Sequence, residues 1–109
     1  MAENPFDHSG IDDVIHGRLR LGIVAYLASV DSASFTELRD KVGATDGNLS
    51  AHVGKLEEVG YVGVAKSFVG RKPQTRLNLT RAGRQAWNAW LDRIERLTRA
   101  ASTNPSGRS

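Results

Sequence analysis

The 109-residue sequence contains no cysteine, few aromatic residues and no long apolar run. Without cysteine it can form neither disulfides nor thiolate metal sites. No apolar stretch approaches the roughly 18 residues that a membrane span needs. The start of the chain, MAENPFDHSG, is acidic and polar, unlike a secretory signal. These absences favour a cytoplasmic protein without a membrane anchor.

Acidic residues are missing from a long part of the second half. Between Val59 and Leu91 there is no Asp or Glu, while six Lys and Arg residues occur there. Residues 1–58 carry 10 acidic and 5 basic side chains, and residues 59–109 carry 2 acidic and 10 basic ones. The modest net charge of +3 therefore hides a strongly basic second half. This asymmetry indicates a polyanionic partner, with an ordinary solvated basic surface as the alternative.

The length predicts a single domain with a small core, which a partner chain would help to complete. Residues 1–10 are polar and contain Pro5 and Gly10, so they are predicted to form a flexible lead. The folded domain is expected over residues 11–101. Residues 102–109, which include Asn104-Pro105-Ser106-Gly107, are predicted to be a disordered tail.

Apolar spacing predicts two helices in the first half of the chain. The first runs over residues 18–30, where apolar residues recur every three or four positions. The second is short, about residues 36–42. Thr36 is its expected N-cap, because a threonine hydroxyl can accept a first-turn amide. Gly43 is its expected stop.

The next helix is capped by Thr45 or Asp46 and is predicted to end near Val59. Its apolar residues form one inward stripe: Leu49, Val53, Leu56 and Val59. The remaining surface carries mostly short or polar residues: Gly47, Asn48, Ser50, Ala51, His52 and Lys55. Two helices joined by a few residues, the first closed by glycine, are typical of a helix-turn-helix.

A β-hairpin is predicted after Gly60. Residues 61–67 alternate as an outgoing strand and residues 76–79 as a return strand. Gly70 and Pro73 lie between them, so the loop is expected to be longer than the tight two-residue type.

Thr80 is expected to cap a final helix over residues 80–101. Its apolar residues are spaced by three and four positions: Trp87, Trp90, Ile94, Leu97 and Ala101. Such a long helix would overhang so small a domain and expose this stripe. Pairing with a second copy of the chain would bury it, and folding back onto the chain's own core is the alternative.

Five short motifs follow one another over roughly residues 11–100: Arg20-Leu21, Phe35-Thr36-Glu37-Leu38, Thr45-Asp46-Gly47-Asn48-Leu49-Ser50, Gly60-Tyr61-Val62 and Leu79-Thr80-Arg81-Ala82-Gly83. In this order they resemble the winged helix-turn-helix of bacterial transcriptional regulators. The closest likeness is to the small MarR-like and ArsR-like single-domain group.

The resemblance implies a mainly α fold with a small β-hairpin, and a homodimeric regulator that binds double-stranded DNA. The helix at about 46–59 would lie in the major groove. The wing, about 61–79, would touch the minor groove or the backbone. The last helix, 80–101, would dimerise through its apolar stripe, and a short strand would lie near Ser34-Phe35.

The chemistry of these residues agrees with that role. Gly47, Ser50 and Ala51 are short, so the helix can approach base edges closely. Asn48 can pair with adenine, and Lys55 can reach guanine or a phosphate. Thr45, the free amides beside it and His52 are candidates for phosphate contacts. The basic side chains of the hairpin would attract the backbone of any DNA sequence: Lys66, Arg71, Lys72 and Arg76.

No motif indicates an enzyme, a metal or a cofactor. Asp12 and His16 are four residues apart, but no third ligand accompanies them. Ser50 and His52 are two apart on a helix and point in different directions. The competing hypothesis is a winged-helix module that binds proteins rather than DNA. The acid-free stretch from Lys66 to Arg84 favours DNA. Any small-molecule effector would have to sit at the dimer seam or between the first and last helices.

Overall fold

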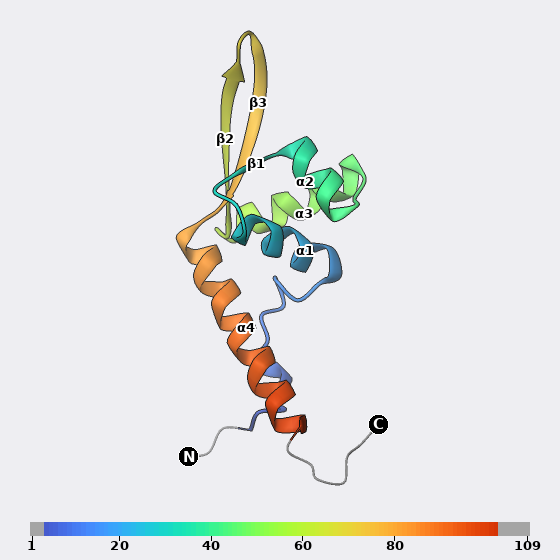
Figure 1. Ribbon diagram of the computed structural model, residues 1–109, viewed down its shortest axis with the longest axis vertical. Coiled ribbons are helices and arrows are strands. Elements are labelled where there is room, and N and C mark those ends of the chain that lie inside the picture. Colours follow the sequence, from blue (N-terminus) through green and yellow to red (C-terminus); the bar gives the residue numbers. More distant parts are fainter. Residues whose placement is uncertain (1–3, 103–109) are drawn as a thin grey trace.

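The computed structural model describes residues 4–102 (Figure 1). Its elements follow one another as η1 His8–Gly10, α1 Arg18–Ala28, β1 Ala33–Ser34, α2 Phe35–Val42, α3 Asp46–Glu58, β2 Val62–Val69, β3 Lys72–Leu79 and α4 Arg81–Ser102. The strands form an antiparallel sheet in the order β1-β3-β2. The predicted mainly α fold with a small hairpin is therefore confirmed. Within the described residues, no helix is both long enough and apolar enough to span a bilayer.

One aliphatic core joins the first three helices to the base of the sheet. Its buried residues come from the segment before α1 and from every element between α1 and β3: Ile15, Ile23, Val24, Leu27, Ala33, Leu38, Leu49, Val53, Leu56, Val62, Leu77 and Leu79. The inward stripe predicted for α3 is confirmed except at its end. Val59 is 37% exposed, because α3 ends at Glu58 and Val59 is its C-cap residue.

The start of α2 differs from the prediction. Ser34, not Thr36, is the N-cap, and its Oγ accepts a hydrogen bond from the Glu37 amide at 3.0 Å. Ser34 has the extended backbone of a strand residue and pairs with Arg76 in β3, so one residue ends β1 and caps α2. Gly43 ends α2 as predicted. Its φ of 68° lies in the left-handed region, which glycine adopts without strain.

The hairpin turn is tighter than predicted. Val69 pairs with Lys72, so only Gly70 and Arg71 form the turn. Gly70 has a φ of 65°, as the first central residue of a type II′ turn requires. Pro73 lies inside β3, opposite Phe68. A proline is tolerated there because β1 pairs only with Leu77 and Arg76, which leaves this edge of β3 unpaired.

The helix α4 starts against the base of the hairpin. Thr80 is its cap, as predicted: its Oγ1 accepts from the Gly83 amide at 3.0 Å and donates to the Gly60 carbonyl at 2.6 Å. A Cβ on Gly83 would lie 2.1 Å from the Tyr61 carbonyl oxygen, so only glycine allows this approach. From there α4 and the hairpin extend in opposite directions (Figure 1).

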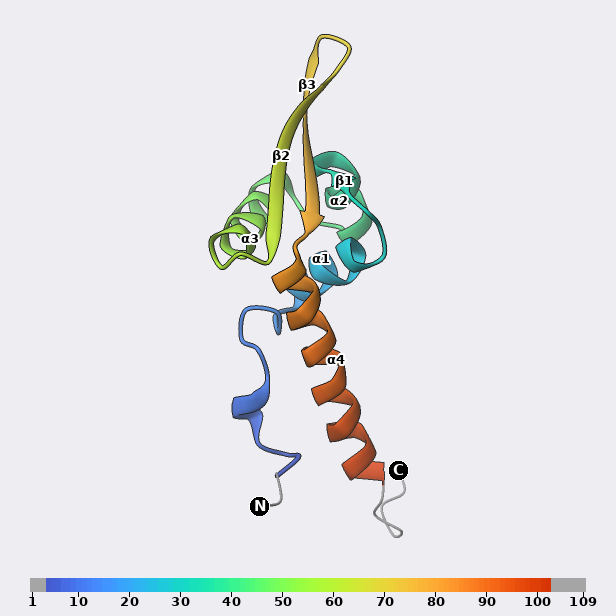
Figure 2. The ribbon, with the colours of Figure 1, turned by 90° about the vertical axis from the view of Figure 1, so that its left-hand side faces the viewer.

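The N-terminal segment, residues 4–17, runs beside α4 (Figures 1 and 2). The Arg93 side chain is only 6% exposed and donates to the carbonyl oxygens of Asp7 and, at 3.4 Å, Asn4. Trp90 Nε1 donates to His16 Nδ1 at 3.1 Å. The predicted flexibility of residues 1–10 stays a prediction. Of the predicted tail, Ser102 still belongs to α4, and residues 103–109 lie outside the described part of the chain.

The cap assignment can be tested with two neighbouring substitutions. Ser34→Ala removes the acceptor for the Glu37 amide and should lower the free energy of unfolding by about 1 kcal/mol. Thr36→Ala is the matched control and should change it little, because Thr36 is exposed and caps nothing. Urea unfolding followed by circular dichroism measures both. A larger loss for Thr36→Ala than for Ser34→Ala would contradict the assignment.

Candidate nucleic-acid interface

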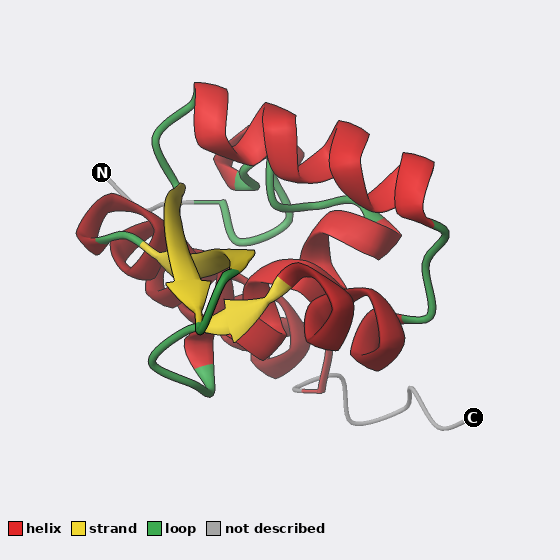
Figure 3. Ribbon diagram, turned by 90° about the horizontal axis from the view of Figure 1, so that it is seen from above, coloured by secondary structure: helices red, strands yellow, loops and turns green. Residues whose placement is uncertain are grey.

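The helix α3 turns one face to the core and leaves the other uncovered along one side of the domain (Figure 3). Leu49, Val53 and Leu56 are buried. The predicted reading residues are exposed, apart from the half-buried His52: Gly47, Asn48, Ser50, Ala51 and Lys55. The structure therefore brings together on one helix surface the residues predicted to read bases.

The middle of this surface is formed by very small residues. Gly47, Ala51 and Gly54 follow at spacings of four and three, so they share one helix face. A Cβ placed on Gly47 or Gly54 would meet no atom within 4 Å, so nothing in the described chain fills the space above them. Gly54 was not among the predicted site residues, although the same spacing argument includes it. Another molecule can approach the α3 backbone closely here.

The N-terminus of α3 is less open to a phosphate than predicted. Thr45 Oγ1 already accepts the Asn48 amide at 3.2 Å. Asp46 adds a carboxylate to the first turn, and Arg39 Nη1 contacts it at 2.8 Å. This hydrogen bond, with that to Asp40, raises the pKa of the Arg39 guanidinium. Thr45 thus acts as a helix cap, and its phosphate contact stays a prediction.

The hairpin contains three exposed cations and no acidic residue. Lys66, Arg71 and Lys72 are exposed, and none forms an ion pair with another described residue. Arg76 differs, because its Nε and Nη2 donate to Ser32 Oγ at 3.2 and 2.8 Å. It fastens β3 to the loop before β1 and is half-buried. Arg76 is therefore also a structural residue, which the spacing of charges along the chain did not indicate.

A groove of about 550 Å³ separates the start of α2 from the hairpin. It is lined by residues of both elements: Ser34, Phe35, Thr36, Val69, Lys72, Pro73, Gln74 and Thr75. Thr36, Gln74 and Thr75 offer polar groups beside Lys72 and were not among the predicted site residues. The pairing of Ala33 with Leu77 brings these segments together, and that contact joins residues far apart in the sequence.

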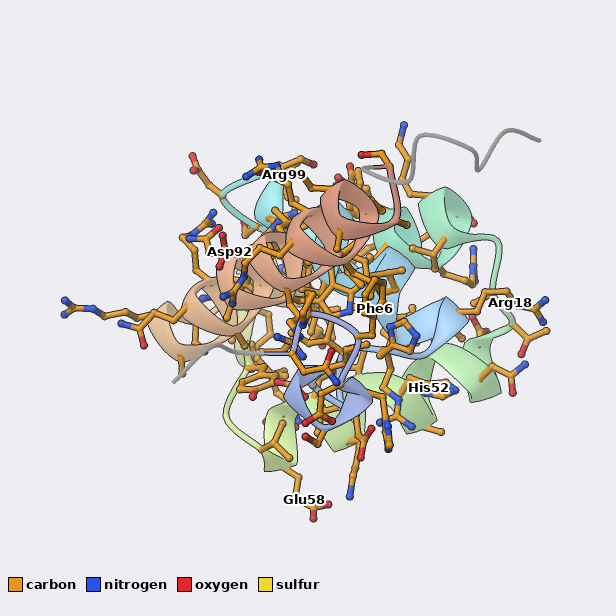
Figure 4. All side chains as sticks on the ribbon, turned by 90° about the horizontal axis from the view of Figure 1, so that it is seen from below. Phe6, Arg18, His52, Glu58, Asp92 and Arg99 are labelled. Carbon is orange, nitrogen blue, oxygen red and sulfur yellow. The ribbon has the colours of Figure 1, made fainter. Side chains whose placement is uncertain are left out.

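The apolar stripe of α4 is divided between two environments. Trp87 and Trp90 stack at 5.5 Å between ring centroids and pack against the chain's own core. This is the alternative that the sequence left open for them. Ile94 and Leu97 are half-buried beyond that core, and Ala101 is exposed. Leu91, which was not predicted, is 43% exposed. Seen from below, Asp92 and Arg99 occupy the outer side of α4, away from Phe6 (Figure 4).

The side chains of Asp12 and His16 form hydrogen bonds with different residues and do not share a site. Asp12 Oδ2 accepts from the Tyr61 hydroxyl at 2.7 Å, and this bond, with partial burial, raises the pKa of Tyr61. His16 Nδ1 accepts from Trp90. Among residues 4–102, no group of three potential metal ligands comes together.

The sequence profile of the winged helix DNA-binding domain matches residues 19–98. The chain belongs to the winged helix DNA-binding domain family. The matched region runs from α1 through the wing into α4, so it contains every residue predicted to touch DNA. The resemblance to winged helix-turn-helix regulators is confirmed.

The chain is also similar to individual proteins. The chain is 33% identical over 86 residues to an uncharacterized protein of Methanocaldococcus jannaschii. The matched region covers 79% of this chain and 94% of that protein. It superposes with a TM-score of 0.76 on a transcriptional regulator homologue from Pyrococcus horikoshii OT3, at 26% identity over 81% of this chain and 87% of the other. A Staphylococcus aureus MarR structure with salicylate and kanamycin shares the fold, with a TM-score of 0.68, at 16% identity over 86% of this chain and 61% of that one.

Proposed function

We propose that this protein is a sequence-specific, double-stranded DNA-binding transcriptional regulator that acts as a homodimer. The observation that carries the proposal is the pairing of two surfaces on a winged-helix fold. One is the uncovered face of α3, built from small and polar residues. The other is the adjoining acid-free hairpin, whose exposed cations have no ionic partner among the described residues.

The two surfaces divide the work of binding. The small residues of α3 let its backbone enter the major groove, where Asn48 can pair with adenine and Lys55 can reach guanine. Lys66, Arg71 and Lys72 neutralise phosphates and release counterions, which attracts any DNA sequence equally. Glu57 and Glu58 at the end of α3 would repel phosphates, and Glu58 lies 3.9 Å from Lys55 Nζ, so Lys55 would exchange this weak ion pair for its contact with DNA.

A second copy of the chain would pair through α4. Ile94 and Leu97 with the exposed Leu91 extend an apolar surface beyond the monomer's own core. A two-fold axis there would present two α3 helices to one DNA site. The Staphylococcus aureus MarR structure is in complex with salicylate and kanamycin. A small-molecule effector of this chain would sit at the dimer seam or between α1 and α4.

Two single substitutions distinguish recognition of bases from attraction of phosphates, and each serves as a control for the other. Arg71→Ala should weaken binding to all duplexes alike and reduce the slope of log affinity against log salt by about 1. Asn48→Ala should leave the salt slope unchanged and lower discrimination at one base position per half-site by about 1–3 kcal/mol. Fluorescence anisotropy titrations at several salt concentrations measure both effects. Loss of base preference in Arg71→Ala, or of salt slope in Asn48→Ala, would contradict this division.

The dimer is tested by sedimentation at micromolar concentration. The wild type should sediment at about twice its monomer mass of 11.8 kDa. Ile94→Glu should shift it to the monomer, because a charge would be buried in the seam. Asn88→Glu is the matched control on the exposed side of α4 and should leave the dimer intact. A wild type that sediments as a monomer would refute the dimer.

A further inference from the structure

The end of the hairpin exposes two large apolar side chains. Phe68 is 72% exposed and Val69 is 62% exposed, the highest values among the large hydrophobic residues of the described chain. Both precede the two-residue turn at Gly70 and Arg71. Val62 at the base of the same strand is buried in the core. Folding of the monomer therefore explains the apolar residues at the base of β2 but not those at its tip.

The tip extends beyond the helices, although Val69, Lys72 and Pro73 also line the groove that faces the start of α2. β1 pairs with β3 only as far as Arg76, and four more residues, Lys72–Thr75, continue β3 beyond that point. At roughly 3.4 Å per residue, this carries the tip about 14 Å past the end of β1. Figures 1 and 2 show the hairpin extending past all the helices.

The covalent structure of the tip restricts its backbone. Gly70 allows the two-residue turn, and the ring of Pro73 restricts the backbone directly opposite Phe68. Side chains of paired residues lie on the same face of a ribbon, so Phe68 lies beside Pro73 on one face and Val69 beside Lys72 on the other. A narrow ribbon with apolar groups on both faces has the shape of a wedge.

Three cations surround these apolar groups. Lys66 shares a face with Phe68, Arg71 lies in the turn and Lys72 opposes Val69. None has an ionic partner among residues 4–102, and the chain contains no acid from Val59 to Leu91. A protein partner would have to supply acidic groups to balance these charges beside an apolar pocket. Duplex DNA supplies both chemistries at once, with phosphates along its groove and the apolar faces of stacked bases between them.

We propose that Phe68, supported by Val69 and Pro73, is a wedge that partly inserts between two base pairs in the minor groove and bends the DNA. The inference rests on the proposed function and adds to it a specific deformation of the target. Apolar side chains inserted at a base step unstack it and kink the duplex toward the major groove. Pyrimidine–purine steps deform most readily, so the wedge would favour a TA or CA step beneath the wing. Phe68 would then contribute to sequence preference without a hydrogen bond to any base.

The experiment uses the full chain and duplexes of about 30 base pairs with 2-aminopurine at a central TA step. One duplex carries a sequence that the protein selects from a random pool, and the other has a mixed sequence. Anisotropy reports binding, and 2-aminopurine fluorescence reports unstacking at saturating protein. The wild type should raise the fluorescence several-fold. Phe68→Ala should still bind but should return the fluorescence close to that of free DNA, and Phe68→Leu should keep an intermediate signal.

Two controls separate the wedge from general effects. Phe6→Ala removes another exposed phenylalanine, one that lies beside α4 and away from the wing, and should change neither readout. Arg71→Ala should require more protein to saturate but should reach the same fluorescence.

The failures are distinguishable. If the wild type binds both duplexes without a rise in fluorescence, the wedge is wrong while the proposed function stands. If Phe68→Ala binds and unstacks as well as the wild type, Phe68 does not act on DNA, and a protein-binding tip replaces the wedge. If neither duplex is bound at low salt, the proposed function fails and the wedge fails with it.

Discussion

Burial of the aliphatic stripe of α3 is the constraint on which the rest of the structure depends. Leu49, Val53 and Leu56 are fully or almost fully buried in the core. Because one helix face is held there, the opposite face with Gly47 and Gly54 must point to solvent. The same core holds Val62, so the hairpin starts directly beside the end of α3. The spatial relation between α3 and the hairpin thus follows from hydrophobic packing.

Charged residues lie outside this aliphatic core, and acidic and basic residues occur in different parts of the chain. Acidic residues are concentrated in the first half of the chain, where Glu37 and Asp46 sit in the first turns of α2 and α3. Negative charge at a helix N-terminus is favourable, so these acids also stabilise the fold. The hairpin contains no acid and keeps three cations exposed. Under the proposed function, folding stability and attraction of DNA therefore depend on different parts of the molecule.

Features that depend on neighbouring residues could be predicted from the sequence. The stripe of α3, the caps Thr45 and Thr80 and the stop at Gly43 each rest on a local spacing or on one side chain's own chemistry. The basic character of the wing was equally visible, because it required only the absence of acids over a long stretch.

Features that depend on distant residues could not be predicted in the same way. Ser34 replaces Thr36 as a cap because β1 pairs with β3, more than forty residues away. Arg76 bonds Ser32 across the same distance. The loop length was mispredicted because Pro73 was taken to exclude a strand, although the adjacent edge is unpaired. The prediction placed Trp87 and Trp90 on a part of α4 that extends beyond the domain, whereas both pack against the core.

Selection of bound duplexes from a random pool tests most directly the central claim, that α3 and the wing read a DNA sequence. The account predicts enrichment of a two-fold symmetric motif whose half-sites lie about one helical turn, roughly 10 base pairs, apart. It also predicts that Asn48→Ala relaxes one position in each half-site. A pool that remains random after repeated rounds at low salt would contradict the account.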